Sequence, residues 1–295
     1  MKKNYVLLVL FCMGLFNSAN AESGSAADND SGSVKVKRPL YAGIGIGNNI
    51  STFRDFATSP LSYSGTAKTV AVFVDRPSDK KDMYIQARYS AGTYKVKDLD
   101  YDKQKRTDLK FANMKSASAR FSMLWKINPI SSEKYNIKLG GTFDAWGNIR
   151  SNAAFQNNGF GSELFTTLFL SAKVSHEINI TETKKIWFLK FNPRYRKTFF
   201  QLNVPVMNNT YRNGYIYTTT AGLDGNSKAS PFKSYEFSAF SGFRLSTTLS
   251  YEQAIFNDNI LRFTYDWDML LSSKKYDQFQ MANHIFLVSL VLKLR

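Results

Sequence analysis

Residues 259–271 read NILRFTYDWDMLL, and their side chains change character at every second position. The odd positions from 261 to 271 carry large apolar groups, whereas the even positions include Arg262, Asp266 and Asp268. Successive side chains of a β-strand point to opposite faces, so this stretch predicts a strand with one apolar and one charged face. What the charged face does depends on which of the two faces meets solvent.

The same period of two recurs from about residue 38 to the last residue, without a helical pattern of useful length. Strands are predicted at residues 39–48, 67–75, 83–93, 116–126, 135–146, 164–174, 187–196, 235–251, 259–271 and 281–295. Every second link is predicted to be the longer one, for example 50–66 and 203–233. Short turns, longer loops opposite them and an even strand count are typical of a membrane barrel. The sequence therefore predicts an all-β fold, a transmembrane antiparallel up-and-down β-barrel of roughly 8 to 12 strands, with ten favoured.

The charged rows bear on the choice between a barrel in lipid and a soluble barrel, whose apolar rows point inward. Burying the Arg, Lys and Asp side chains of most strands in a dry core would be very costly, so the charged rows must meet water. That water can be in the lumen of a barrel in lipid, or it can be the solvent around a soluble secreted β-protein. Aromatic rings collect at membrane interfaces and stand toward the ends of the apolar rows, as Trp125, Tyr135, Trp187, Tyr235, Tyr251 and Trp267. We therefore expect lipid outside, with Asp266 and Asp268 pointing inward and Trp267 outward.

The first 37 residues are predicted to lie outside the barrel. A positive start, an apolar run from Tyr5 to Phe16 and the small-x-small sequence Ala-Asn-Ala at 19–21 predict a secretory signal peptide over residues 1–21. Residues 22–37 are rich in Gly, Ser, Asn and Asp and lack apolar residues for a core, which predicts a flexible periplasmic lead-in. The barrel is then expected over residues 38–295.

The formal net charge of the chain is +16 at pH 7. For an exported protein this charge favours anionic lipid headgroups or acidic glycans over nucleic acid as partners, and it also serves plain solubility. Cys12 is the one cysteine and lies in the predicted signal, so thiol catalysis and cysteine-ligated metal sites are excluded from the mature protein. We expect no cofactor, no metal site and no nucleic-acid partner.

The alternating rows of residues 38–295 resemble those of the outer-membrane β-barrel proteins of Gram-negative bacteria, and they look most like the Bacteroidota-type barrels. The last strand, Phe286 to Arg295, is similar to the C-terminal strand that the barrel-assembly machinery reads in this class, except that Arg295 replaces the usual terminal aromatic. The resemblance implies a location in the cell outer membrane after export through a cleaved signal peptide. It also implies two partners, outer-membrane lipid and the barrel-assembly machinery.

A lumenal charge network is predicted from the polar rows. Its members are Arg88, Arg120, Lys190, Arg194, Arg196, Arg244, Arg262, Asp266 and Asp268. Small barrels fill their interior with side chains, so we expect a mostly filled polar lumen, and the excess of basic groups would make any remaining pore prefer anions. The predicted membrane-interface aromatics are Trp125, Trp187, Tyr235, Tyr251 and Trp267.

Asp266 and Asp268 are the candidate catalytic residues, because two carboxylates on one face can divide the roles of acid and base between them. The alternative is a salt-bridge lattice with Arg262 and Arg244, which the number of basic neighbours favours.

Three other features give weaker signals. His176 is expected beside a periplasmic turn and His284 in the outward row near the outer rim, so neither histidine fits a lumenal base. Residues 98–102 (DLDYD) resemble a calcium loop, but Lys103 stands where its glycine is needed. The glycines of residues 43–47 (GIGIG) are predicted to be small lumen-facing residues, because no helix follows them as in a nucleotide loop.

The predicted function is a structural or surface-interaction role exerted through outer loops. Loop 203–233 is rich in Asn, Thr, Tyr and Gly, which suits adaptable contacts with an extracellular ligand, although the loop could equally lack a dedicated ligand. Two other classes stay open. One is a narrow anion-preferring channel, and the other is an outer-membrane hydrolase that uses Asp266 and Asp268. The sequence favours a role without catalysis.

Overall fold

The computed structural model describes residues 39–294 except 57–58, 97–110, 133, 152–159, 181–183, 187–188, 192–193, 214–234, 256–257 and 273–277. The predicted signal peptide and lead-in lie outside these residues. The strands are β1 (Tyr41–Asp55), β2 (Ser59–Arg76), β3 (Lys81–Val96), β4 (Phe111–Lys126), β5 (Tyr135–Ser151), β6 (Phe160–Ile180), β7 (Lys184–Ile186), β8 (Leu189–Phe191), β9 (Arg194–Asn213), β10 (Tyr235–Ser238), β11 (Phe243–Ala254), β12 (Ile260–Ser272) and β13 (Phe279–Lys293), with one 3₁₀ helix, η2 (Asn128–Ile130). None of the described helices is long and apolar enough to cross a membrane.

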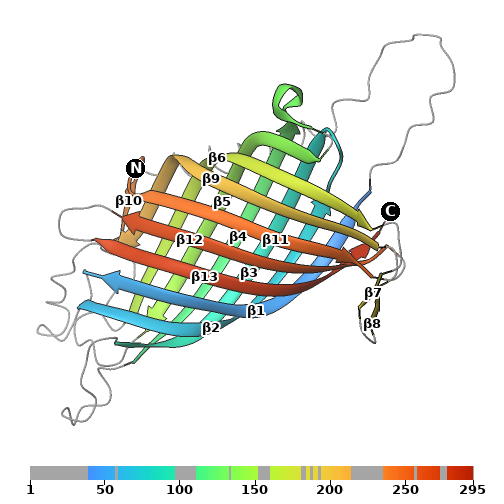
Figure 1. Cartoon of the computed structure of the whole chain (residues 1–295). Coiled ribbons are helices and arrows are strands. Elements are labelled where there is room, and N and C mark those ends of the chain that lie inside the picture. The colour runs from blue at the N-terminus through green and yellow to red at the C-terminus, as the bar shows by residue number, and fades with distance from the viewer. Residues whose placement is uncertain are drawn as a thin grey trace, which may run out of the picture. The chain divides into compact units, whose positions relative to one another are not determined.

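Ten strands close into a barrel, because β6 pairs antiparallel with β9 and completes the ring (Figure 1). β10 and β11 both pair with β9 and count as one interrupted strand. β1 and β13 pair from Tyr41 with Lys293 to Asp55 with Phe279. We call the end at Tyr41 and Lys293 the near end of the barrel, and the end at Asp55 and Phe279 the far end. The predicted antiparallel up-and-down barrel of ten strands is confirmed.

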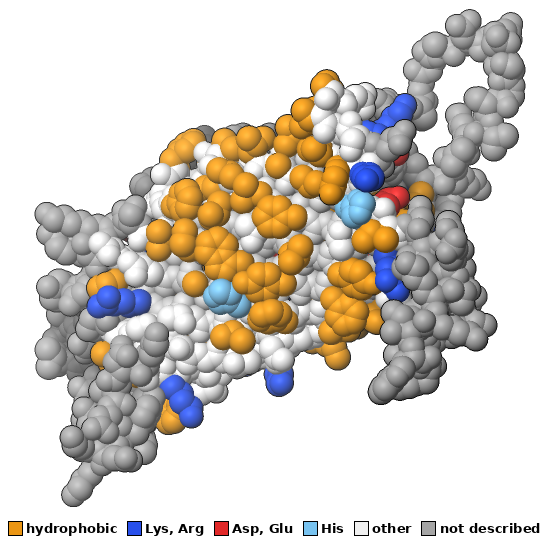
Figure 2. Space-filling view, in the orientation of Figure 1, with side chains coloured by type: hydrophobic (Ala, Val, Ile, Leu, Met, Phe, Trp, Pro, Cys, Tyr) orange, Lys and Arg blue, Asp and Glu red, His pale blue; other side chains and the backbone are white. Residues whose placement is uncertain are grey.

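The two faces of the strands differ as the alternation predicts. On β12, Arg262, Asp266 and Asp268 are 5%, 2% and 3% exposed and point inward, while Phe263 is 44% exposed and Trp267 shares its outward row. Apolar side chains cover most of the barrel face seen in Figure 2, and Lys and Arg lie toward its margins. A closed ring of paired strands with an apolar exterior leaves no backbone edge in lipid, which is the architecture of a transmembrane barrel.

The far ends of β1 and β2 extend beyond their predicted limits. β1 continues to Asp55 and β2 begins at Ser59, so the long link predicted at 50–66 is wrong and the alternation of link lengths holds only in part. The outward row turns polar in this region, for example at Ser64 and Thr66, while the strand pairing continues. A polar outward row was interpreted as a loop because the prediction relied on contrast between the two faces.

The strand predicted at 187–196 is also misplaced. β7 and β8 form a separate two-stranded hairpin, and the barrel strand is β9. Both segments alternate between apolar and polar residues, so periodicity alone could not choose between them. The predicted loop 203–233 therefore starts too early, since residues 203–213 belong to β9 and residues 214–234 lie outside the described chain.

A bulge at residues 239–242 separates β10 from β11. Phe240 and Gly242 have φ of 51° and 79°, in the left-handed region that glycine adopts without steric cost. The Ser241 amide donates to the Asn208 carbonyl at 2.7 Å, and the Asn208 side-chain amide donates to the Ser241 carbonyl at 2.6 Å. β9 therefore holds both halves of the interrupted strand in one sheet.

Candidate functional site

An aromatic cluster fills the lumen toward the far end. Phe53 stacks on Tyr63 with ring centroids 5.2 Å apart, and Phe165 stacks on Phe279 at 5.8 Å. We call the whole buried set the far-end cluster; it comprises Phe53, Tyr63, Ala67, Tyr94, Val96, Ala112, Met114, Trp146, Phe165, Leu270, Phe279 and Met281. The lumen was predicted to be polar, and this part of it is apolar instead. The inward rows carry these aromatics among their polar residues, and the prediction gave weight only to the charges.

Two arginines bind the far-end cluster to a pair of buried acids. Arg150 pairs with Glu163 and, at 2.7 Å, with Asp55, and Arg212 pairs with Asp55 at 2.9 Å. Their guanidinium carbons also lie 4.8 and 5.1 Å from the centroid of the Phe279 ring. Cation–π contacts of this kind let a charged layer pack directly on an aromatic one.

Arg244 is the centre of a second ionic layer midway along the barrel. It is 0% exposed, and it donates to both oxygens of Asp268, from Nε at 3.0 Å and from Nη2 at 2.7 Å. Its Nη1 donates to Asp144 Oδ1 at 2.8 Å, and Arg120 Nε donates to the other oxygen of Asp144 at 2.8 Å. Bidentate pairing of this kind is geometrically specific, so the layer has one favoured arrangement.

Asp266 belongs to the same layer. Its Oδ2 accepts from Arg88 Nη1 at 3.0 Å, and its Oδ1 accepts from the Thr248 hydroxyl at 2.6 Å. Asp266 and Asp268 are therefore each held by a different arginine. This arrangement is a salt-bridge lattice, in which neither carboxylate is free to meet a substrate.

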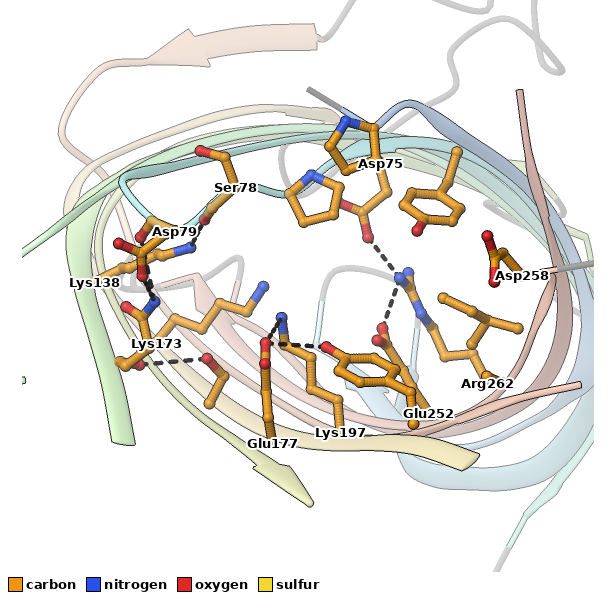
Figure 3. Close-up of a pocket in the computed structure, with 18 of the residues that line it drawn as sticks. Asp75, Ser78, Asp79, Lys138, Lys173, Glu177, Lys197, Glu252, Asp258 and Arg262 are labelled. Atoms are coloured by element: carbon orange, nitrogen blue, oxygen red, sulfur yellow. Dashed lines mark hydrogen bonds and ion pairs between the residues drawn. The ribbon is translucent and has the colours of Figure 1, made fainter. Parts of the chain in front are cut away.

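The near end of the barrel opens into a cavity of about 810 Å³, which we call the vestibule (Figure 3). Arg262 projects into one side of it, between Asp75 at 2.5 Å and Glu252 at 2.7 Å. The opposite side of the vestibule carries an excess of positive charge, because the lysines there outnumber the acids.

Three neighbouring strands supply that basic side. Lys138 on β5 and Lys173 on β6 share the carboxylate of Asp82, at 2.5 and 2.9 Å. Lys197 on β9 has Glu177 as its nearest acid, at 3.6 Å. These ammonium groups make this side of the vestibule favourable for a small anion.

The vestibule is a blind cavity. Beside Asp266 and Arg120 the open space falls to about 40 Å³. At the level of Asn49 and Ser118 the next pocket along the lumen leaves about 0 Å³ for a water-sized sphere. The central ionic layer and the far-end cluster therefore close the lumen in the part of the barrel that the structure describes.

The structure brings together six of the nine residues predicted for the lumenal network. Arg88, Arg120, Arg244, Asp266 and Asp268 lie in the central layer, and Arg262 lies in the vestibule. The side chains of Lys190 and Arg194 lie outside the described residues.

The prediction for Arg196 is wrong, because Arg196 stands in the outward row of β9. Its neighbours Tyr195 and Lys197 both line the vestibule, and alternation turns Arg196 the other way. The error follows from the misplaced strand at 187–196, because its even-numbered residues, Arg196 among them, were predicted to point inward.

Sequence reasoning did not single out several residues that organise the lumen. Asp144, Lys138 and Trp146 stand in one inward row of β5, as the alternation of residues 135–146 requires. Asp55, Arg150 and Arg212 lie in segments that were predicted to be links, and Glu163 directly precedes the strand predicted at 164–174. Longer strand assignments would have placed them in inward rows.

The predicted interface aromatics lie in outward rows where they are described. Trp125 is 47% exposed and lies under Lys81 Nζ, 5.4 Å from the ring centroid. Tyr251 and Trp267 are partly exposed, and the Tyr235 hydroxyl lies 2.7 Å from Ser162 Oγ. Trp187 lies outside the described residues.

The histidines make no catalytic arrangement with the lumenal carboxylates. His176 Nδ1 lies 2.8 Å from the Lys134 carbonyl, and His284 Nδ1 lies 2.8 Å from the hydroxyl of the outward-facing Tyr265. Among the described residues no group of three or more His, Cys, Asp and Glu side chains could hold a metal ion.

No known family model and no curated protein matches the chain. Among solved structures it is similar to the outer membrane protease OmpT from Escherichia coli, at 8% identity and a TM-score of 0.49, over 91% of this chain and 100% of that one. It is also similar to Neisserial surface protein A, at 6% identity and a TM-score of 0.35, over 86% of this chain and 97% of that one. It is similar as well to the transport unit of the autotransporter AIDA-I from Escherichia coli, at 9% identity and a TM-score of 0.36, over 93% of this chain and 97% of that one. The likeness is one of barrel architecture alone.

Proposed function

We propose that the protein is an integral outer-membrane barrel with a sealed lumen, which acts through contacts at its surface rather than by conducting solutes. The blind vestibule carries the proposal. Solutes that enter at the near end meet the salt bridges of Arg244 and Arg120, and beyond them the far-end cluster. A barrel packed in this way is suited to serve as a rigid support for its loops.

The exterior of the barrel supports the membrane location. Ile44, Val72, Leu170, Leu249 and Phe286 are each 50% exposed or more, on strands all around the ring. Export through a signal peptide at residues 1–21 stays a prediction. In cell fractionation we expect the protein in the outer-membrane pellet, with a gel mobility that changes on heating. Recovery as a soluble protein without detergent would contradict the membrane location.

Conductance measurements test the seal. Purified protein inserted in planar bilayers is expected to give no steady current, because the space beside Asp266 is only about 40 Å³. The basic side of the vestibule favours the entry of anions but offers them no exit. A steady anion-selective current through the unmodified protein would support the channel alternative and overturn the proposal.

The hydrolase alternative finds less support in the geometry. Asp266 and Asp268 are 2% and 3% exposed, and each is bound by an arginine. A general acid or base must reach the reacting group of its substrate, and no substrate-sized space adjoins this pair. The hydrolase alternative would be supported instead if the protein hydrolysed lipid or peptide and lost this activity on Asp268→Asn, in a variant that still folds.

The partners of the barrel stay predictions. The contact role is assigned to the far-end loops, above all residues 214–234 of the predicted loop 203–233, with an extracellular ligand as the expected partner. Recognition by the barrel-assembly machinery is assigned to the C-terminal strand, β13. The narrower resemblance to Bacteroidota-type barrels is also a prediction, since no family model matches.

A further inference from the structure

Four basic residues face outward from four consecutive strands, one at the middle of its strand and three in the far halves. Arg54 stands on β1, Lys68 on β2, Lys95 on β3 and Lys115 on β4, and all four are exposed. Their inward neighbours, such as Tyr63, Tyr94 and Met114, are 2% exposed or less, which fixes the direction of each row. We call Lys68, Lys95 and Lys115, with Arg54 at their margin, the basic face.

The basic face lies on one side of the barrel. From the middle to the far end of the other barrel strands, as far as these are described, the outward rows contain no lysine or arginine. Charge that served only solubility would be expected on all sides of the rim and with mixed sign. A single sign on four adjacent strands instead suggests a localised anionic partner.

Acidic residues are absent from the outward rows of β1–β4. The three acids of these strands, Asp55, Asp75 and Asp82, are buried in the lumen. Lys68 Nζ donates to the neutral side chain of Asn48 at 3.1 Å, and the Thr93 hydroxyl donates to Asn113 at 2.8 Å. The exterior near the lysines is therefore positive and rich in hydrogen-bonding groups.

The strand register brings two of the lysines close together. Lys68 pairs with Ala91, and Ala91 pairs with Lys115 on its other side, so one strand with a small side chain separates the two lysines. Their Cα atoms are then about 10 Å apart, within reach of one doubly charged oxyanion for two flexible side chains.

The height of Lys115 on the barrel wall matches the edge of the apolar band. Trp125 and Lys115 stand in the same outward row of β4. At about 3.3 Å per residue and a strand tilt of about 40°, roughly 25 Å separates them along the barrel axis. An outer-membrane barrel has an apolar band of about that height, so with Trp125 at one interface Lys115 reaches the headgroups of the other.

We propose that the basic face binds the phosphate headgroup of an anionic lipid in the leaflet at the far end of the barrel, with Lys68, Lys95 and Lys115 as its ligands. The proposal rests on the membrane location given under the proposed function. The lipid is favoured over an acidic protein because the lysines project sideways from the barrel wall, with Lys115 at headgroup height.

Lipid retention tests the proposal. The full-length protein is reconstituted in vesicles of equimolar phosphatidylglycerol and phosphatidylcholine and extracted in mild detergent, and its retained lipids are counted by mass spectrometry. The wild type is expected to be enriched in phosphatidylglycerol. The variant Lys68→Gln, Lys95→Gln, Lys115→Gln is expected to lose that enrichment by roughly fivefold or more, since each basic residue at an anionic surface contributes about fivefold.

A matched control removes the same charge at the near end, with Lys80→Gln, Lys126→Gln and Lys134→Gln, and is expected to keep the enrichment. Heat-modifiable mobility shows that each variant is folded. Equal enrichment in wild type and the basic-face variant overturns the proposal, as does equal loss in the control. If the protein retains both lipids in the bulk ratio, the basic face has no lipid preference although the membrane location stands. If it retains neither lipid, the membrane location itself fails.

Discussion

Arg244 has no exposed surface, yet its three nitrogen atoms are engaged by the carboxylates of Asp144 and Asp268. Burying one charge is costly, and burying several is tolerated only where each finds a partner with good geometry. The central layer meets this condition by alternating arginines with acids across the lumen. The same condition makes each member hard to replace.

Asp268→Asn tests the structural role of this carboxylate. The change leaves Arg244 buried with Asp144 as its one remaining anionic partner, so the free energy of unfolding is expected to fall by about 3 kcal/mol. The measurement is urea unfolding of the refolded barrel, monitored by tryptophan fluorescence. Asp79→Asn is the control, because the Asp79 side chain is 68% exposed and its pair with Lys126 contributes little. Equal effects of both changes would contradict the buried lattice.

At the scale of the strand, the bulge between β10 and β11 depends on one glycine. Gly242 has φ of 79°, and a Cβ there would lie 2.5 Å from the Leu271 carbonyl oxygen. The strand must shift to accept any side chain at this position.

Gly242→Ala is therefore expected to lower the free energy of unfolding by about 1–3 kcal/mol. Gly141→Ala is the matched control in another strand, since its Cβ would meet only the Phe169 carbonyl oxygen, at an ordinary 3.8 Å. Urea midpoints of the two variants provide the comparison. A midpoint for Gly242→Ala that equals the wild type would show that the bulge adapts without cost.

The strands illustrate how far the sequence predicts this fold. The face of each residue in 259–271, 164–174 and 135–146 was predicted correctly, because burial in a barrel depends only on parity. The far ends of β1 and β2 were missed, because their outward rows turn polar there and the contrast between the two faces is lost, although Phe53 and Tyr63 stand in the inward rows. β9 was confused with the β7–β8 hairpin, because pairing partners far apart in sequence leave no local signal.

For the whole barrel, the lumen consists of three layers: the vestibule, the central ionic layer and the far-end cluster. The central layer could be predicted in part, since Arg88, Arg244, Asp266 and Asp268 stood in predicted inward rows. Which acid meets which arginine depends on strand neighbours across the ring, such as Arg88 of β3 and Asp266 of β12. Alternation within single strands does not contain that information.

Removing two rings from the far-end cluster is expected to open the barrel. Phe165 and Phe279 are both 0% exposed and stack on each other. In the variant Phe165→Ala, Phe279→Ala, we expect brief anion-selective currents where the wild type gives none. Without these two rings the central ionic layer is no longer packed against the far-end cluster, so its side chains are expected to fluctuate and open the lumen briefly. A variant with Leu249→Ala and Phe286→Ala, which removes outward side chains, is the control. Silence of both variants would show that the ionic layer alone closes the lumen.

The apolar exterior is not equally tall on all sides of the barrel. On β10–β12 it reaches the far rim, with Phe237 65% exposed, Phe240 78% and Leu271 37%. On β2 it ends at Val70, and Lys68 follows. A bilayer of uniform thickness cannot match both sides of an upright cylinder, so the barrel axis should lean away from the membrane normal or the bilayer should thin beside β1–β4. The far rim of the barrel would then stand higher above the membrane on one side than on the other, so a partner in the medium would meet its two sides at different heights.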